Sequence, residues 1–458
     1  MFPSGASSQF TIPIGVSGKY TPVTYTVTTS TPGAINVRPV NREHPALSDV
    51  TGNELKYYWS VDATGFGADL QMTHKYQYVV EDVTGNIGQY VVGLYRYNIY
   101  TWDNLGNASN PGKVNTVDKT IEVINVNYAT GDYTAGHSDN FVSLPTYYSR
   151  NNRPNDNWTE QGNWSTVSHA DNTHLATAPP HGNPIVIAAG HTMTINANQQ
   201  MQASVEVNGV LNCGNTVFHN LGHVSGTGKI VLESIDEGCF VFPGGEYEDF
   251  FTTTGTIVEL TSVESACMPL KPGNFSKPFN NLILSGGGPK IMSAEDLRIR
   301  GWLEIKDGTE LDGSLHDKNI YISGDWINKN TASNSFIAGK GTVFIEGTAT
   351  QNIDAYAQEK FYNFTMQNSA GLNIINKPIE ITKTLLLTQG VIHSDTNKEV
   401  ILYNSSASEA VIGTKSTSFV DGPVKKRIIS GQSFNFPTGN NGRLGVVRLT
   451  NATSSQQY

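Results

Sequence analysis

Short runs in which apolar and polar residues alternate cover most of the chain, and these runs end at Gly, Asn or Asp. In residues 279–308 the apolar positions lie two apart, at Leu297 and Ile299 and again at Leu303 and Ile305. A period of two is that of a β-strand with one apolar face, whereas a helix repeats every 3.6 residues. The pattern therefore predicts short β-strands joined by turns.

The same pattern returns without a gap in residues 361–390, at an offset of 82 positions that aligns Phe279 with Phe361 and Gly308 with Gly390. A strand of a few residues cannot bury its apolar face alone, so repeated copies are expected to stack at a fixed period, each coil covering the next. This predicts a parallel β-solenoid. A duplicated β-sandwich module, which also has short alternating strands, is the alternative.

The first part of the chain shows a different arrangement of strand-like runs, separated by turn sequences such as TGN and TGFG. Regular spacing of this kind is typical of an antiparallel sandwich. The predicted fold class is therefore all-β: an immunoglobulin-like β-sandwich in residues 1–145, a parallel β-solenoid (β-helix) with an N-terminal cap in residues 146–424, and the start of a second β-sandwich in residues 425–458.

Tryptophans are the candidates for ligand binding, because sugars dock their apolar faces on flat rings. Trp59 and the tyrosines around it form either such a platform or the core of the sandwich. Trp158 and Trp164 lie in a polar, loop-like stretch and are suited to closing the open end of the solenoid. The weak candidate ligand-binding residues are Trp59, Trp102, Trp158 and Trp164.

A succession of phrases carries a family resemblance: GDWINKN, GKGTVFIEGTATQNIDA, FYNFTMQNSAGLNIINKPIEITKTLLLTQGVI and SFVDGPVKKRI. From about Tyr147 onward the chain resembles the solenoid repeats of very large surface or secreted proteins of the Bacteroidota that are exported by the type IX system. The resemblance implies an extracellular, repetitive and mostly non-enzymatic surface or adhesin-like protein.

Composition narrows the function further. Only 15% of the 458 residues are charged and 45 are Gly, which favours an all-β extracellular scaffold. The net charge of −10 argues against nucleic acid as a partner, because binding to phosphates requires a basic face. No apolar run is long enough for a membrane span, and no signal peptide is present, so we expect any export signal to lie outside this sequence.

The three cysteines are Cys213, Cys239 and Cys267, at spacings of 26 and 28 residues. An odd number cannot form a complete disulfide framework, and none has a CxxC partner. A redox or metal site is one interpretation. The favoured one places all three inside the solenoid, one coil apart, as small apolar side chains.

Three groups of metal-ligating residues occur in predicted loops, and none has the spacing of a known site. The first has transition-metal chemistry, the second is expected to be two exposed histidines, and the third suggests calcium. The groups are His169, Asp171, His174 and His181; His219 and His223; and Asp307, Asp312 and Asp317. We predict no metal and no other cofactor.

No catalytic motif is present, and the prediction is a non-enzyme. The enzymatic alternative is a β-helix polysaccharide lyase that uses Arg298 and Arg300 on one outward face near Glu304 and Lys306. Two other hypotheses remain: a structural segment of a cell-surface fibre or filament, and an adhesin that holds surface glycan. The adhesin hypothesis requires exposure on one side of at least two of the six tryptophans, which are Trp59, Trp102, Trp158, Trp164, Trp302 and Trp326.

A second internal match joins the two ends of the chain, because residues 433–450 align with residues 9–26 at a constant offset of 424. At the C-terminal end the strand pair has nothing of its own to pack against, and its unpaired edge invites another chain. We expect further sequence, or the sandwich of a neighbouring copy, to complete it. The predicted assembly residues are Phe434, Phe436, Pro437 and Val447, with Phe10, Pro13 and Val23.

Overall fold

The computed structural model describes residues 4–47, 52–96, 101–106, 111–142, 144–196, 202–214, 219–234, 238–269, 278–454 and 456–457. It is nearly all β, with 48% strand and 4% helix. The chain forms two compact units: residues 1–186 with 199–206 and 220–223, and the remaining residues. Within these ranges the helical segments are η1 (Val80–Asp82), η2 (Ile87–Gln89), η3 (Ser138–Asn140), η4 (Gln161–Asn163) and α1 (Glu248–Thr252).

Two five-stranded antiparallel sheets form the sandwich in the first unit. The first sheet has the order β1 (Gly5–Ile12), β4 (Val23–Thr29), β7 (Gln71–Gln77), β11 (Thr120–Val126) and β10 (Gly112–Asn115). The second has the order β5 (Ala34–Val40), β6 (Tyr58–Thr64), β12 (Gly131–Gly136), β8 (Val91–Arg96) and β9 (Thr101–Asn104). A separate short hairpin joins β2 (Gly15–Val16) to β3 (Lys19–Tyr20).

Alternate residues of β4 form the core of this sandwich. Val23, Tyr25 and Val27 are at most 2% exposed, and they belong to one cluster with Trp59 of β6 and Tyr133 of β12. The threonines between them are only partly buried or exposed. The two-residue period of the sequence is thus the period at which β4 turns a side chain into the core.

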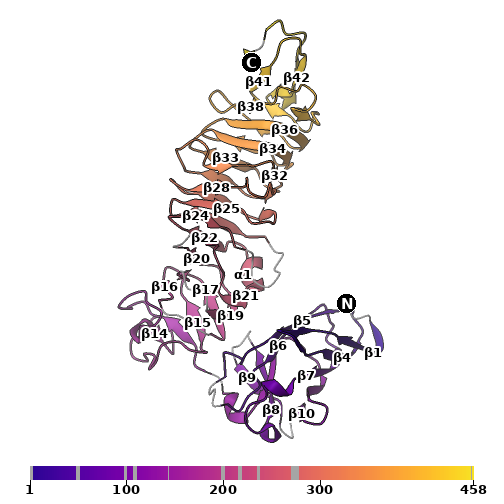
Figure 1. Ribbon diagram of the computed structural model, residues 1–458, viewed down its shortest axis with the longest axis vertical. Helices are drawn as coiled ribbons and strands as arrows, with labels where there is room; N and C mark the ends of the chain where they lie inside the picture. The colour runs from indigo at the N-terminus through magenta and orange to yellow at the C-terminus, as the bar shows by residue number, and fades with distance from the viewer. Residues whose placement is uncertain are drawn as a thin grey trace. The chain divides into compact units, whose positions relative to one another are not determined.

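The second architecture is a parallel β-solenoid of about 11 turns, which excludes the duplicated sandwich for this region (Figure 1). Its longest sheet has thirteen strands, in the order β16 (Thr192–Thr194), β18 (Val210–Asn212), β20 (Lys229–Glu233), β22 (Ile257–Thr261), β24 (Asn281–Ser285), β27 (Leu303–Ile305), β30 (Trp326–Asn328), β33 (Gln351–Ala355), β35 (Leu372–Ile374), β37 (Ile392–His393), β40 (Val420–Asp421), β43 (Thr438–Asn440) and β44 (Arg443–Leu444).

Three further sheets contribute to the coils. One contains β26 (Leu297–Ile299), β29 (Ile320–Ile322), β32 (Thr342–Ile345), β34 (Glu359–Gln367), β36 (Ile379–Gln389), β38 (Val400–Leu402), β41 (Val424–Ile428) and β46 (Gln456–Gln457), with β39 (Val411–Ile412) beside β36. A four-stranded sheet contains β23 (Ala266–Cys267), β25 (Pro289–Ile291), β28 (Glu310–Asp312) and β31 (Phe336–Ile337). A six-stranded sheet contains β14 (Trp164–Ser165), β13 (Tyr147–Ser149), β15 (Pro184–Ile187), β17 (Ser204–Val207), β19 (Asn220–Ser225) and β21 (Gly244–Glu246).

Columns of apolar side chains run through the solenoid, with one residue from each coil. Leu282, Leu303, Trp326 and Ile353 are consecutive partners in the thirteen-stranded sheet, and each is at most 1% exposed. Neighbouring strands of a sheet lie about 4.8 Å apart, so each side chain in a column is covered by the next coil. Burial that one short strand cannot achieve is supplied by stacking, as the sequence predicted.

The expected fixed period is wrong, however. Stacked residues are 20 positions apart from Leu372 to Ile392 but 28 apart from Ile392 to Val420. The 82-residue offset also does not correspond to a whole number of coils, because it joins strands that lie in different sheets. β24 lies in the thirteen-stranded sheet, whereas the matching residues 363–367 lie in β34 of the sheet that begins with β26. The repeat identifies strands but not the face on which each strand lies.

Candidate assembly interface

The two ends of the chain form the same pair of outer strands. In the first copy β1 pairs with β4, so that Phe10 lies opposite Tyr25. In the second copy β42 (Phe434–Phe436) pairs with β45 (Val447–Leu449), so that Phe434 lies opposite Leu449. Both pairings are antiparallel, and every pair of β42–β45 is a pair of β1–β4 shifted by 424 positions. The sequence match is therefore a match in register.

The inner hairpins agree in the same way. Val16 lies opposite Lys19, and 424 positions later Asn440 lies opposite Arg443. Both turns place two residues at positive φ: Ser17 (54°) and Gly18 (77°) in the first copy, and Asn441 (52°) and Gly442 (73°) in the second. Two consecutive residues of this kind are the mark of a type I′ turn, which fixes the register of a hairpin. Residues 9–26 and 433–450 thus share one nested double hairpin.

Burial is inverted between the two copies. In the first, Val23 is fully buried, whereas Phe10 is 56% exposed and Pro13 is exposed. In the second, Val447, the counterpart of Val23, is 59% exposed. The strand that contains Val23 is thus covered in the sandwich, whereas the matching strand that contains Val447 is exposed at the C-terminal end.

The first strand of the second copy packs on the end of the solenoid instead. Phe434 and Phe436 are 4% and 8% exposed, and Pro437 is buried. The Lys426 ammonium lies 5.1 Å from the centre of the Phe434 ring, and the Val420 N–H donates to the Pro437 carbonyl at 2.8 Å. β43 also continues the thirteen-stranded sheet beside β40. The expectation that this strand pair has nothing of its own to pack against is therefore wrong for β42.

β4 and its counterpart β45 differ in what lies along their second edge. In the first copy β4 pairs along its second edge with β7, where Val23 lies opposite Tyr76. In the part of the chain that the structure describes, β45 pairs only with β42. Val446 and Val447 are 48% and 59% exposed beside that edge. β1 is likewise the outermost described strand of the first sheet. Among the described strands, β1 and β45 thus each have one edge along which no strand is paired.

The tryptophan platform is wrong. Trp59, Trp158 and Trp164 are fully buried and Trp102 is 7% exposed. Their rings contact other rings: Trp158 and Trp164 meet edge to face at 5.1 Å, and Trp102 lies 4.7 Å from the His44 ring. These four indoles offer no free face to a sugar, and the alternative interpretation of Trp59, as part of the sandwich core, is confirmed.

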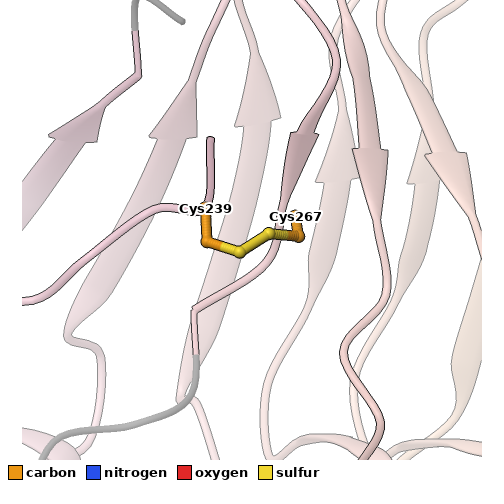
Figure 2. The surroundings of a disulfide bond; sticks show 2 residues. All are labelled: Cys239 and Cys267. Atoms are coloured by element: carbon orange, nitrogen blue, oxygen red, sulfur yellow. A yellow bond between two sulfur atoms is a disulfide. The ribbon is translucent and has the colours of Figure 1, made fainter. Parts of the chain in front are cut away.

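The interpretation of the cysteines is corrected in part. Cys239 and Cys267 lie on neighbouring coils, paired by a parallel bridge, and they form a disulfide (Figure 2). Cys213 is a buried free thiol, and burial raises its pKa. The pair is one coil apart, as expected, but Cys239 is exposed and Cys267 is half-buried, so the expected place inside the solenoid holds for Cys213 and is wrong for Cys239.

The metal-ligating groups do not converge, and no group of three or more His, Cys, Asp or Glu side chains among the described residues could hold a metal ion. His169 bonds to the Ser149 carbonyl, and Asp171 pairs with His174 at 2.7 Å, while hydrogen bonds to the Thr173 and His174 segment lower the pKa of Asp171. His181 is exposed.

The other two groups also behave as structural residues. His219 is 3% exposed and burial lowers its pKa, so the expectation that it is exposed is wrong. Each of the three aspartates accepts a bond from a backbone N–H at a turn: Asp307 from Thr331, Asp312 from Ser314 and Asp317 from Lys340.

The residues of the lyase alternative lie on different sheets. Arg298 is in β26 and stacks on the Tyr321 ring at 3.8 Å, while Glu304 is in β27 of the thirteen-stranded sheet. Glu304 is 7% exposed and forms ion pairs with Lys306 and Lys329. Arg298 and Arg300 are both exposed, as that alternative requires, but Glu304 is buried and belongs to another sheet, so the expected grouping with Glu304 is wrong.

Comparisons with known proteins identify no relative: no family model, no curated protein and no solved structure matches this chain. In the described part of the chain, none of the helices has the length and apolar character needed to cross a membrane. The candidate site therefore rests on the geometry of the two strand edges.

Proposed function

We propose that this chain is a segment of an extracellular fibre in which the solenoid is a stiff spacer and strand pairing joins successive copies. The observation that carries the proposal is the double hairpin of residues 433–450. It has the register of the sandwich hairpin, yet in the part of the chain that the structure describes no strand pairs with β45 on the edge where β4 has β7.

The occupant of the β45 edge in this proposal is β1 of a second copy. β1 is the outermost described strand of a complete sheet, so it accepts a new neighbour without opening the sandwich. Its Phe10 is 56% exposed, and Val447 on β45 is 59% exposed. Pairing the two edges adds main-chain hydrogen bonds and covers both side chains, which is the usual chemistry of strand addition.

The two edges are different surfaces, so the contact is heterologous and propagates from copy to copy unless the rotation closes a ring. Buried apolar columns such as Leu282, Leu303, Trp326 and Ile353 run through the coils, which suits a spacer more than a ligand carrier. The Cys239–Cys267 disulfide supports an oxidising environment, where such bonds persist. This is compatible with a place outside the cell.

A charge on either edge tests the proposal. Val447→Lys and Phe10→Lys each place an ammonium at the contact, so both are expected to abolish assembly. Val263→Lys is the matched control, because Val263 is 71% exposed and lies outside any strand. A point variant is preferable to deletion of residues 434–458, which would uncover the last coil.

The measurement is light scattering after size exclusion over a concentration series, with electron microscopy of the largest species. Wild type and Val263→Lys are expected to form linear particles that lengthen with concentration, and the two edge variants are expected to stay monomeric. A wild-type chain that is monomeric throughout, or a Val447→Lys chain that assembles like wild type, contradicts the proposal.

A further inference from the structure

A lysine, an asparagine and a buried aspartate meet in the sandwich. The Nζ of Lys19, in β3, donates to Oδ1 of Asn41 at 2.5 Å and to Oδ1 of Asp82. Asn41 follows β5, and Asp82 is the last residue of η1. The Asp82 side chain is 2% exposed, whereas that of Lys19 is 26% exposed. An amine, an amide carbonyl and a carboxylate are thus brought together from three separate elements.

One oxygen of the Asp82 carboxylate takes no part in the ion pair with Lys19. Its Oδ2 atom is buried and has no hydrogen-bond partner among the residues that the structure describes. A buried carboxylate oxygen without a donor is costly, and this oxygen is placed to hold a proton during a reaction at the neighbouring Nζ. The Tyr57 ring, fully buried, lies with its centre 5.9 Å from Nζ and limits the access of water from that side.

We propose that Lys19 and Asn41 join in an intramolecular isopeptide bond, with Asp82 as the proton carrier. A carbonyl bond is about 1.23 Å long, so an Nζ atom 2.5 Å from Oδ1 lies no more than about 3.7 Å from the Asn41 Cγ. That is close to the separation of about 3 to 3.5 Å from which positioned groups react.

The reaction needs no further reagent. Asp82 takes one proton from the Lys19 ammonium, and the free amine attacks Cγ of Asn41. The Cγ–Nδ2 bond then breaks, and the nitrogen leaves as ammonium after it receives the proton that Asp82 holds and one of the two protons left on Nζ. One ammonium and one carboxamide become one secondary amide and one free ammonium ion, and Asp82 ends as the carboxylate it was.

The second double hairpin offers an internal contrast. The position equivalent to Lys19 is Arg443, which is exposed and whose guanidinium does not act as an amine nucleophile. The proposed bond is therefore specific to the N-terminal copy, where it ties the β2–β3 hairpin to the end of β5. It goes beyond the fibre proposal and stands whether or not the copies assemble.

A second Lys–Asn contact, on the solenoid, serves as the matched control. Lys360 Nζ donates to Asn334 Oδ1 at 3.3 Å on the solenoid. The contact has the same two functional groups and, like the Lys19–Asn41 contact, it is exposed, but it is longer. We expect no bond between Lys360 and Asn334.

The test is mass spectrometry of the full chain after reduction of the disulfide. The expected mass is lower than the sequence mass by one ammonia, and the digest contains the Lys19 peptide joined to the Asn41 peptide. Lys19→Arg, which keeps the positive charge beside Asp82, is expected to restore the sequence mass, and Asp82→Asn is expected to leave Lys19 and Asn41 in linear peptides. A wild-type chain at the full sequence mass overturns the proposal, as does a loss of water with Lys19 joined to Asp82.

Discussion

Glu359 is a carboxyl group in the interior of the solenoid, and it makes the stability of the coils depend on pH. It is 3% exposed, and its Oε2 accepts hydrogen bonds from Trp326 Nε1 at 3.0 Å and from Asn328 Nδ2 at 2.8 Å. Burial raises its pKa from 4.5 to about 7, although the two donors act in the opposite direction. The desolvation of the charged form outweighs the hydrogen bonds.

The sign of the effect follows from proton binding. Between pH 4.5 and about 7 the folded state holds a proton on Glu359 that the unfolded state has lost. Glu359 therefore contributes its full stabilisation of the folded state below its pKa in the unfolded chain. This contribution is lost as pH rises through its pKa in the folded chain. At about 1.4 kcal/mol for each unit of pKa, the loss is about 3 kcal/mol.

Glu359→Gln removes the charge and keeps a carbonyl oxygen for the two donors. We expect the variant to match wild type near pH 4 and to be more stable by about 3 kcal/mol near pH 8. The assay is urea unfolding of both proteins at several pH values. The difference between the two cancels the contribution of other groups, such as Glu409, whose pKa is lowered by the hydrogen bond and charge of Lys383.

Glu295→Gln is the control, because Glu295 is an exposed carboxylate on the same solenoid. It is expected to leave the pH dependence unchanged. A constant difference between Glu359→Gln and wild type across this pH range, or a difference that grows toward low pH, refutes the reasoning.

Two further predictions concern covalent and backbone geometry. Replacing both Cys239 and Cys267 by Ser opens a loop of 28 residues and is expected to lower the free energy of unfolding in urea by about 3 to 4 kcal/mol. Without reductant, a thiol titration of the unfolded wild-type chain should detect the one free thiol of Cys213. Three titratable thiols would contradict the disulfide. Gly308 and Gly390 match in sequence and both have positive φ, but a Cβ at Gly390 would lie 1.8 Å from the Asn368 carbonyl oxygen, while at Gly308 the nearest atom is 4.0 Å away. Gly308→Ala is therefore expected to cost about 1 to 2 kcal/mol for the left-handed backbone alone and Gly390→Ala clearly more, so equal losses in thermal unfolding would argue against this packing.

Local patterns in the sequence were sufficient to predict the strands. Leu297 with Ile299, and Leu303 with Ile305, are the ends of β26 and β27. The match between the two chain ends also carried register, because Ser17–Gly18 and Asn441–Gly442 are turn residues that fix how the flanking strands pair. Alternation and turn chemistry are properties of neighbouring residues, so a sequence displays them directly.

Features that depend on distant neighbours were missed. The coil length varies because loops between stacked strands differ in length, and an internal match does not reveal on which sheet a strand falls. The burial of Trp158 depends on Trp164 and the fold around it, and the Cys239–Cys267 bond depends on how two coils align. Lys19, Asn41 and Asp82 are far apart in sequence, and no local pattern links them.

Disulfide trapping between two copies tests the assembly most directly. One protein carries Phe10→Cys and the other Val447→Cys, each on the edge that the fibre proposal joins. Mixed under mild oxidation, the two are expected to form a covalent dimer that neither protein forms alone. Val263→Cys replaces Val447→Cys in the control mixture, which should give no such dimer. A Phe10→Cys and Val447→Cys mixture that yields no more dimer than this control contradicts the pairing of β45 with β1.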